Sequence, residues 1–442
     1  MKSLLFKKRN PIYVYAFLLA ISPGPALGMT LENALMQSLK TSNKVASSRE
    51  GWVAARESIF ASGSTKETSF KYSGSTSLTE ADSGSGYKSS DSYSNKITMS
   101  RNLYDGGQSK ENRLKAEISL QRTTAQYKGT EQGVILETVQ SFLGLIKSRQ
   151  EYELQTKNLD RLKQHVTAAE VRVSQGTDTL TSLAEAKARF ARARADTALA
   201  KAQLESSDDS FVKLTGVSSA TEIKFPELLN VKQMLPETIG LAEELALKNN
   251  PSVLTAMAAE KAASQDLVIT KTKQNSTVAF SLSATDGKSS DSLAASLTLS
   301  APLYATNSTT SNARKTVALH SKSMIDLREA LSAAKLKARA AFRDWDAVKI
   351  TSNAVEAEVE ASRLVQKGVS NEVKYGLKTT LDMLDAEKSF SEAELRLVKA
   401  NHDEILAEFE LISAVGKLTL ENLGLGNPLI PLDEIPRPKN PL

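Results

Sequence analysis

Two short stretches indicate how this chain folds: ITMSRNLY at residues 97–104 and LTLSAPLY at residues 297–304. In both, apolar residues alternate with Thr and Ser, and a Leu-Tyr pair closes the stretch. Alternation with a period of two is typical of a β-strand with one apolar face. Because the stretches lie 200 residues apart in the same form, they also predict a duplicated unit.

The duplication extends along the chain. Gly176 and Gly376 keep the 200-residue offset, and so do Gly216 and Gly416. Upstream, TLENALMQSLKTSN from Thr30 resembles TIGLAEELALKNNP from residue 238, at an offset of 208. The first copy therefore carries about eight extra residues, which we place in the Ser/Gly-rich stretch SGSTSLTEADSGSGYKSSD.

Each copy is predicted to contain a helix, a β-hairpin and two long helices in the same order. In the first repeat (29–230) these lie at about 30–66, 67–104, 108–174 and 177–215. In the second repeat (231–420) they lie at about 238–274, 276–304, 308–374 and 377–417. A Pro-rich tail, 421–442, follows, and we expect it to be extended or disordered.

The second hairpin shows the strand pattern most clearly. Val278, Phe280 and Leu282 alternate with Ala and Ser residues, and Leu297 and Leu299 alternate with Ser and Thr. An apolar face opposite a Ser/Thr face suits a membrane barrel, apolar toward lipid and polar toward a lumen. A soluble hairpin with one buried face has the same alternation, so the pattern alone leaves both open.

The long helical segments carry apolar residues at spacings of three and four. Such spacing predicts coiled-coil packing of antiparallel helices. A helix of about 66 residues is about 100 Å long at 1.5 Å per residue, far longer than a globular helix. The clearest series is Met324, Leu327, Leu331, Ala334, Ala338, Ala341, Trp345 and Val348.

The first 28 residues have the pattern of a secretory signal peptide. They hold four basic residues, a short apolar run at 12–21 and a small-residue cleavage site at 26–28. An uncleaved anchor is the alternative, although the apolar run is short for a membrane span. The whole chain has 56 Lys and Arg against 51 Asp and Glu, so beyond this acid-free segment the balance is 52 against 51. The basic pI therefore predicts no nucleic-acid partner.

Composition also argues against catalysis. The chain has no Cys, and His165, His320 and His402 are far apart in sequence. Metal sites and nucleophile–His triads are therefore poorly supported, and no phosphate-binding loop is present. We expect no catalytic residue, metal or cofactor. Past the signal no apolar run of 18 residues occurs, so a membrane role requires β-strands.

Four strands cannot close a membrane barrel, because small barrels need about eight. Open strand edges are not tolerated in hydrocarbon, where each unpaired backbone group costs several kcal/mol. If these strands enter a membrane, at least two chains must share one barrel. The long helices would then continue away from the membrane as a coaxial assembly.

Several motifs occur in order along the two copies. They are the strand-to-helix junction at 100–107 (S-x-x-L-Y-D-G-G), its partner at 300–304, the Asn-Asn-Pro turn at 249–251 and the segment G-x-K-T-x-x-D-x-L-D-A at 376–386. Each motif is weak alone. Together, over about 29–420, they resemble the TolC-like outer membrane channel proteins.

That resemblance implies a mixed α+β membrane protein. It implies a homotrimer with a twelve-stranded β-barrel in the outer membrane of a Gram-negative bacterium and an α-helical tunnel across the periplasm. It also implies a passive exit duct for type I protein secretion or multidrug efflux, joined through a periplasmic adaptor to an inner-membrane transporter, ABC or proton-driven. The alternative is a periplasmic coiled-coil adaptor or surface stalk without a membrane barrel, and an enzyme is a third class with little support.

Asp382 and Asp385 are the main candidate site residues. At positions i and i+3 of a helix they share a face. The resemblance implies that three copies line the periplasmic entrance as a cation-attracting ring. Acids solvated near a helix start, favoured by the helix dipole, are the simpler interpretation, and a metal site is a third. Gly176 and Gly376 are expected to end the preceding long helices in left-handed geometry.

Lys378 matches the position where the resemblance implies a basic residue that ties the entrance shut. Its expected partners are Thr181 and Ser182 in the matching turn of the first copy. The family pattern has an acid where Ser182 stands, and Glu185 is a candidate substitute. A solvated surface lysine is the alternative.

Overall fold

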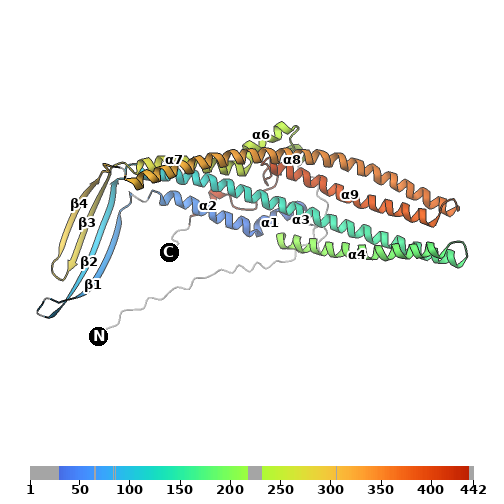
Figure 1. Cartoon of the computed structure of the whole chain (residues 1–442), viewed down its shortest axis with the longest axis horizontal. Helices are drawn as coiled ribbons and strands as arrows, with labels where there is room; N and C mark the ends of the chain where they lie inside the picture. Colours follow the sequence, from blue (N-terminus) through green and yellow to red (C-terminus); the bar gives the residue numbers. More distant parts are fainter. Residues whose placement is uncertain are drawn as a thin grey trace.

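The computed structural model describes residues 29–63, 66–82, 84, 86–217, 231–304 and 306–437. The predicted signal peptide lies outside these residues. The described chain is a long helical body with a four-stranded sheet at one end, inclined to the helices (Figure 1). Among the described residues, no helix combines the length and apolar character that crossing a membrane requires.

The same series of elements occurs twice along the chain. The first series is α1 (Leu31–Thr41), α2 (Asn43–Ala61), β1 (Ser69–Asp82), β2 (Tyr87–Tyr104), α3 (Gln108–Ser174) and α4 (Leu180–Thr215). After the short α5 (Val231–Met234) come α6 (Ile239–Asn249), α7 (Pro251–Thr272), β3 (Thr277–Gly287), β4 (Ser292–Ser300), α8 (Asn307–Lys374) and α9 (Thr380–Ala414). The prediction of a mainly helical chain with four strands is confirmed.

The single helix predicted at the start of each copy is wrong, because each is two helices. Between α1 and α2, Ser42 leaves helical geometry and its side chain accepts a hydrogen bond from the Val45 amide. Between α6 and α7, the Asn250 side chain accepts from the Ser252 amide at 2.9 Å. Pro251 follows at the first helical position, where its missing N–H costs nothing. Both breaks are N-caps that restart a helix.

The sheet is antiparallel, in the order β1-β2-β3-β4. Its register places Phe70 opposite Met99, Met99 opposite Leu282, and Leu282 opposite Ala295. The apolar residues of all four strands therefore share one side, which we call the apolar face. Phe70 and Leu297 on this face are 74% and 67% exposed in the single chain.

The opposite side, which we call the Ser/Thr face, has a different composition. One row across the four strands is Ser69, Ser100, Ser281 and Ser296. The Ser69 and Ser100 hydroxyls are 2.7 Å apart, and those of Ser281 and Ser296 are 2.8 Å apart. The sheet thus has one face suited to apolar surroundings and one suited to water.

The extra residues of the first copy lengthen its strands. β1 and β2 have 14 and 18 residues, whereas β3 and β4 have 11 and 9. The Ser/Gly-rich stretch forms the outer halves of β1 and β2, which pair from Ser69–Ser100 to Asp82–Tyr87. The first hairpin therefore reaches farther from the helices than the second (Figure 1).

The main apolar core lies in the helical body, where α1, the middle of α3 and the ends of α4 and α9 meet. Phe142, Phe211 and Phe409 are its largest fully buried side chains. The rings of Phe142 and Phe211 lie 6.1 Å apart between centroids. This core joins the first and last helices of the chain.

Residues 425–437 of the tail form no regular element except the short helix Leu432–Glu434, but residues 421–437 pack against the helical body instead of being disordered. Leu423 is buried in the main core, and Leu425 packs against it. Farther on, the Ile435 carbonyl accepts a hydrogen bond from Arg56 Nη1 at 2.6 Å. Arg437 lies over the Phe60 ring at 3.0 Å. Apolar side chains spaced along the tail thus fold it back along α2, despite its proline content.

Four helices form two long hairpins, α3 with α4 and α8 with α9. α3 has 67 residues and α8 has 68, which corresponds to about 100 Å each. The hairpins pack side by side, chiefly through α3 and α9. Their turns lie together at the end of the body farthest from the sheet (Figure 1).

Candidate functional site

The two turns at the far end carry the candidate site residues. Gly176 has φ +69° and Gly376 has φ +73°, in the left-handed region. Just after them, the Thr177 amide donates to the Arg172 carbonyl and the Leu377 amide to the Glu372 carbonyl, both at 2.9 Å. A left-handed glycine with this bond across the last turn is the Schellman arrangement that ends a helix. Both hairpins therefore turn in the same way.

The first turn is bonded to the start of α9. Asp178 Oδ2 accepts a hydrogen bond from Thr380 Oγ1 at 2.7 Å, and Arg172 Nη2 donates to Thr380 Oγ1 at 3.3 Å. Arg172 Nε also lies 3.4 Å from Asp178 Oδ2. Partial burial alone would raise the pKa of Asp178, but hydrogen bonds from Thr380 and the Thr179 amide lower it overall. Sequence reasoning missed Arg172 and Asp178 because their common partner, Thr380, lies in the other repeat.

Asp382 caps its own helix. Its Oδ2 accepts hydrogen bonds from the Thr379 amide at 2.9 Å and the Thr379 hydroxyl at 2.7 Å. In return, the Asp382 amide donates to Thr379 Oγ1 at 3.2 Å. This is a capping box at the start of α9. The hydrogen bond from the Thr379 side chain, more than any other contact, lowers the pKa of Asp382. The carboxylate is thus a local cap and a partly exposed negative charge.

Asp385 has a different partner. Arg189 Nη2 on α4 lies 2.7 Å from Asp385 Oδ1 and 3.0 Å from Glu185 Oε1. The Arg189 side chain is 21% exposed and that of Asp385 is 61% exposed. Within one chain, therefore, a largely buried guanidinium offsets the charge of Asp385. Asp382 forms no ion pair with a described residue, although the nearby charge of Lys378 also lowers its pKa. The i, i+3 spacing puts both acids on one helix face, but it cannot reveal an arginine from the other hairpin.

The structure does not bring Lys378 to its expected partners within one chain. Lys378 is exposed and makes no ion pair with any described residue. Thr181 is also exposed, while the Ser182 hydroxyl lies 3.0 Å from Thr179 Oγ1. Glu185 pairs with Arg189. The role of Lys378 in closing the entrance stays a prediction.

A buried polar cluster joins α3 to α9 farther from the turns. Arg161 on α3 pairs with Glu387, which is 2% exposed, and its Nη2 lies 3.5 Å from Glu394. Gln366 on α8 donates a hydrogen bond to Glu387 Oε2 at 2.9 Å. Burial lowers the pKa of the neighbouring His165 despite the opposing charge of Glu387. The two hairpins are therefore linked at several positions along the half of their length that is farthest from the sheet.

The described part of the chain lacks the ligand groupings that a metal site requires. In the described ranges, no three His, Asp or Glu side chains are grouped closely enough to hold a metal ion. The carboxylate of Asp382 accepts a hydrogen bond from Thr379 at the start of α9, and the carboxylate of Asp385 pairs with Arg189. The end of the helical body farthest from the sheet therefore carries carboxylates whose positions are fixed by hydrogen bonds and an ion pair.

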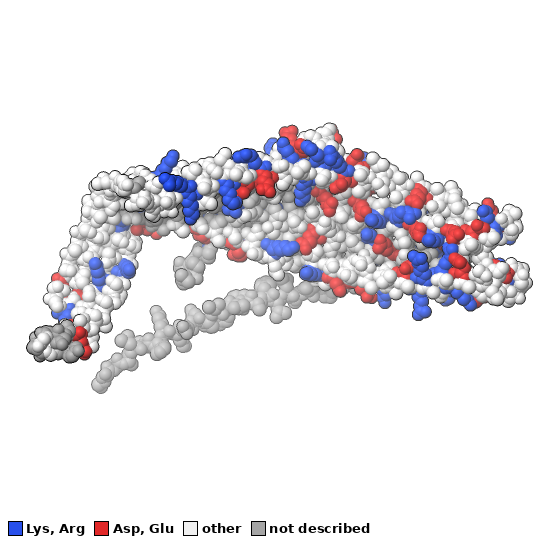
Figure 2. All heavy atoms as spheres, viewed as in Figure 1, with Lys and Arg blue, Asp and Glu red and all other residues white. Residues whose placement is uncertain are grey.

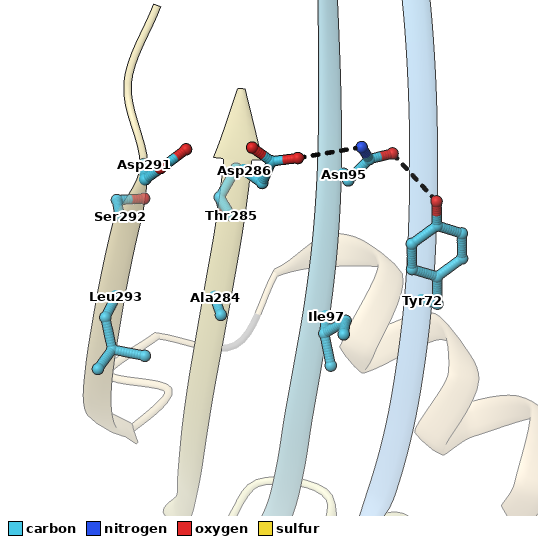
Figure 3. A pocket seen from close by; sticks show the side chains of 9 residues that line it. All are labelled: Tyr72, Asn95, Ile97, Ala284, Thr285, Asp286, Asp291, Ser292 and Leu293. Carbon is cyan, nitrogen blue, oxygen red and sulfur yellow. Dashed lines mark hydrogen bonds between the residues drawn. The ribbon is translucent and has the colours of Figure 1, made fainter. Parts of the chain in front are cut away.

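At the opposite end, the apolar face of the sheet has a polar border (Figure 3). The Tyr72 hydroxyl donates to Asn95 Oδ1 at 3.0 Å, and Asn95 Nδ2 donates to Asp286 Oδ2 at 3.3 Å. The next row toward the helices contains Ile97 and Leu293, and these residues line a shallow pocket of about 430 Å³. Figure 2 shows acidic and basic residues over the helices and few over the sheet. The apolar face is thus a band with a defined outer limit.

Comparison with known proteins identifies the family. The sequence profile of the outer membrane efflux proteins matches residues 34–217 and again residues 243–417. The chain belongs to this family. BepC, an outer membrane efflux protein of Brucella suis, is 24% identical over 441 residues, covering 96% of this chain and 94% of BepC. The outer membrane protein TolC of Vibrio cholerae is 21% identical over 320 residues, covering 70% and 73%.

Solved structures of outer membrane channels share the fold. The CmeC channel of Campylobacter jejuni superposes with a TM-score of 0.75 over 94% of each chain, at 13% identity. The resemblance to TolC-like channels is therefore confirmed, together with an outer membrane location and a channel function for this outer membrane efflux protein. The alternative of an adaptor or surface stalk is not supported.

Proposed function

We propose that three copies of this chain form one outer membrane channel. Each copy supplies four strands to a shared twelve-stranded barrel, and the internal twofold repeat supplies two helical hairpins per copy to a tunnel across the periplasm. The supporting observation is the register that collects the apolar residues of four strands on one exposed face. A single chain leaves this apolar face exposed, and contact with lipid would bury it favourably.

The two edges of the sheet support the sharing of strands between copies. β1 and β4 are edge strands in the described chain, and β1 alone has 14 residues. Unpaired backbone groups cost several kcal/mol each in hydrocarbon. Pairing β4 of one copy with β1 of the next satisfies both edges and continues the antiparallel alternation. Closure after three copies leaves no edge.

The channel acts as a passive conduit in this proposal. A periplasmic adaptor and an inner-membrane transporter, ABC or proton-driven, bring cargo to the helical end, as in type I secretion or multidrug efflux. The name of BepC, an outer membrane efflux protein, supports efflux. Purification after crosslinking in intact cells would identify the adaptor and transporter.

The turns at the far end form the periplasmic entrance in this proposal. Asp382 and Asp385 of three chains surround it as an acidic ring. Lys378 faces the neighbouring chain, where Thr181, Ser182 and Glu185 are its candidate partners. Support comes from the position of these residues after the turns farthest from the sheet and from the partly exposed Asp382, whose pKa is lowered.

One experiment tests the channel itself. The full chain, extracted from membranes in detergent, should have the mass of three protein copies by light scattering and should form conducting pores in planar bilayers. A protein that remains a well-folded monomer without detergent would contradict the proposal, because its apolar face would then be compatible with water.

A further inference from the structure

The two faces of the sheet differ in charge as well as in polarity. Lys71 lies opposite Thr98, and Lys96 lies opposite Ser73, so both lysines belong to the Ser/Thr face. They are diagonal neighbours on β1 and β2, a geometry in which long side chains are within reach of each other. Both are exposed, and neither makes an ion pair with any described residue.

Acidic residues of the sheet lie on the other side. Glu80, Asp91 and Asp286 occupy register positions of the apolar face, beyond the apolar band. Asp286 accepts a hydrogen bond from Asn95, and Asp91 pairs with Lys288. Within the described strands, no Asp or Glu belongs to the Ser/Thr face.

The charge of the Ser/Thr face is therefore positive, because lysine is its only source in the described strands. Its Ser and Thr hydroxyls carry no net charge and can donate or accept hydrogen bonds, so they tolerate cargo of either sign. Unpaired ammonium groups on such a surface attract anions, and rings of lysine are one means by which pores select them. Three copies would place six of these ammonium groups around one lumen.

We propose that the sheet end of the channel attracts multivalent anionic solutes through Lys71 and Lys96. This inference rests on the proposed barrel, in which the Ser/Thr face lines the lumen. The exit then carries a fixed charge opposite in sign to Asp382 and Asp385 at the helical end. Anionic cargo that reaches the barrel meets a favourable potential there, and anions outside meet it first.

A blocking experiment tests this. Full-length trimers are inserted with one orientation into planar bilayers in 0.1 M KCl, where the screening length is about 10 Å. Inositol hexakisphosphate, added on the sheet side, should interrupt the current at lower concentration than when added on the helix side. The double variant K71Q/K96Q should raise the half-blocking concentration about tenfold, and each single variant about threefold.

Matched controls separate charge from shape. The variant K71R/K96R keeps both charges, so inositol hexakisphosphate should block it at the same concentration as the natural protein. Block should weaken for the natural protein in 1 M KCl, where the screening length is about 3 Å. If the double variant yields no trimer, the single variants still decide the question.

The two possible failures are distinguishable. Unchanged block in the glutamine variants, with normal open-channel conductance, would overturn the anion site and leave the channel intact. Equal block from both sides of the natural protein would overturn it as well. Failure of the natural protein to form any pore would instead contradict the proposed function.

Discussion

The guanidinium of Arg189 on α4 lies 2.7 Å from the carboxylate of Asp385 on α9. These helices belong to different hairpins, so the pair ties the hairpins together near their turns, nine residues past the start of α4 and five past the start of α9. Arg189 also holds Glu185, at 3.0 Å. One largely buried cation therefore serves two of the acids that the sequence indicates for the channel entrance, and Asp382 stays outside this arrangement.

Replacing Arg189 should expose the charge of Asp385. R189Q is expected to increase the cation preference of single channels about twofold, because two carboxylates lose their partner. The measurement is the reversal potential across a KCl gradient. K187Q is the matched control, because it removes a basic residue of the same helix whose ion pair, among the described residues, is with Glu170 at 2.8 Å. Equal shifts in both variants would mean that Arg189 does not mask the entrance acids.

Neutralising the two aspartates should have the opposite effect. D382N/D385N is expected to lower the cation preference, and D382N alone should lower it more than D385N, because Asp385 is already paired. D382E is the control, since glutamate keeps the charge and suits the third position of a capping box. Unchanged selectivity in the double variant would reject an acidic ring at the entrance.

Sequence patterns revealed the elements more readily than their contacts. Alternation identified the strands around Leu297, and spacings of three and four identified the long helices. The outer halves of β1 and β2 were harder, because Ser, Thr and Gly occupy both faces there and no alternation remains. The Arg189–Asp385 and Arg161–Glu387 pairs were invisible, because each joins residues from different repeats. Such contacts depend on how the hairpins pack, which no local pattern specifies.

Glu408 should make stability depend on pH. It is 4% exposed, and its Oε2 has no hydrogen-bond partner among the described residues. Burial, with a smaller contribution from Glu404, raises its pKa, although Lys232 and Lys349 oppose this. Folding therefore favours the protonated form. The contribution of Glu408 is fully present below the ordinary glutamate pKa of about 4.3 and is lost as pH rises through the raised value.

E408Q should consequently raise the melting temperature at pH 7.5 and leave it nearly unchanged at pH 4. Thermal unfolding of the detergent-solubilised protein at both pH values provides the measurement. E410Q is the control, because Glu410 is exposed on the same helix and accepts a hydrogen bond from Gln140. An identical pH response in the two variants would show that burial of Glu408 has no such effect.

Neighbouring residues of β4 should respond differently to a new charge. L297D places a carboxylate on the apolar face and should reduce the yield of outer membrane trimer several-fold, at a cost of about 1–2 kcal/mol per subunit. T298D places the same group on the Ser/Thr face and should assemble normally. The amount of trimer in isolated outer membranes, measured by gel electrophoresis, distinguishes the two variants. Normal assembly of L297D would count against contact between the apolar face and lipid.

The most direct test of the central claim is disulfide crosslinking between the two edge strands. The chain has no cysteine, so Ser73→Cys in β1 can be combined in turn with Ala294→Cys and Ser296→Cys in β4 without interference. Within one chain two strands separate these positions, which at about 4.8 Å per strand spacing puts them at least about 14 Å apart, too far for a disulfide. Oxidised outer membranes should give covalent species of two and three subunits, reversed by reductant, with nothing larger. Monomers alone for every pair, or a ladder that continues beyond three subunits, would contradict a barrel closed by three copies.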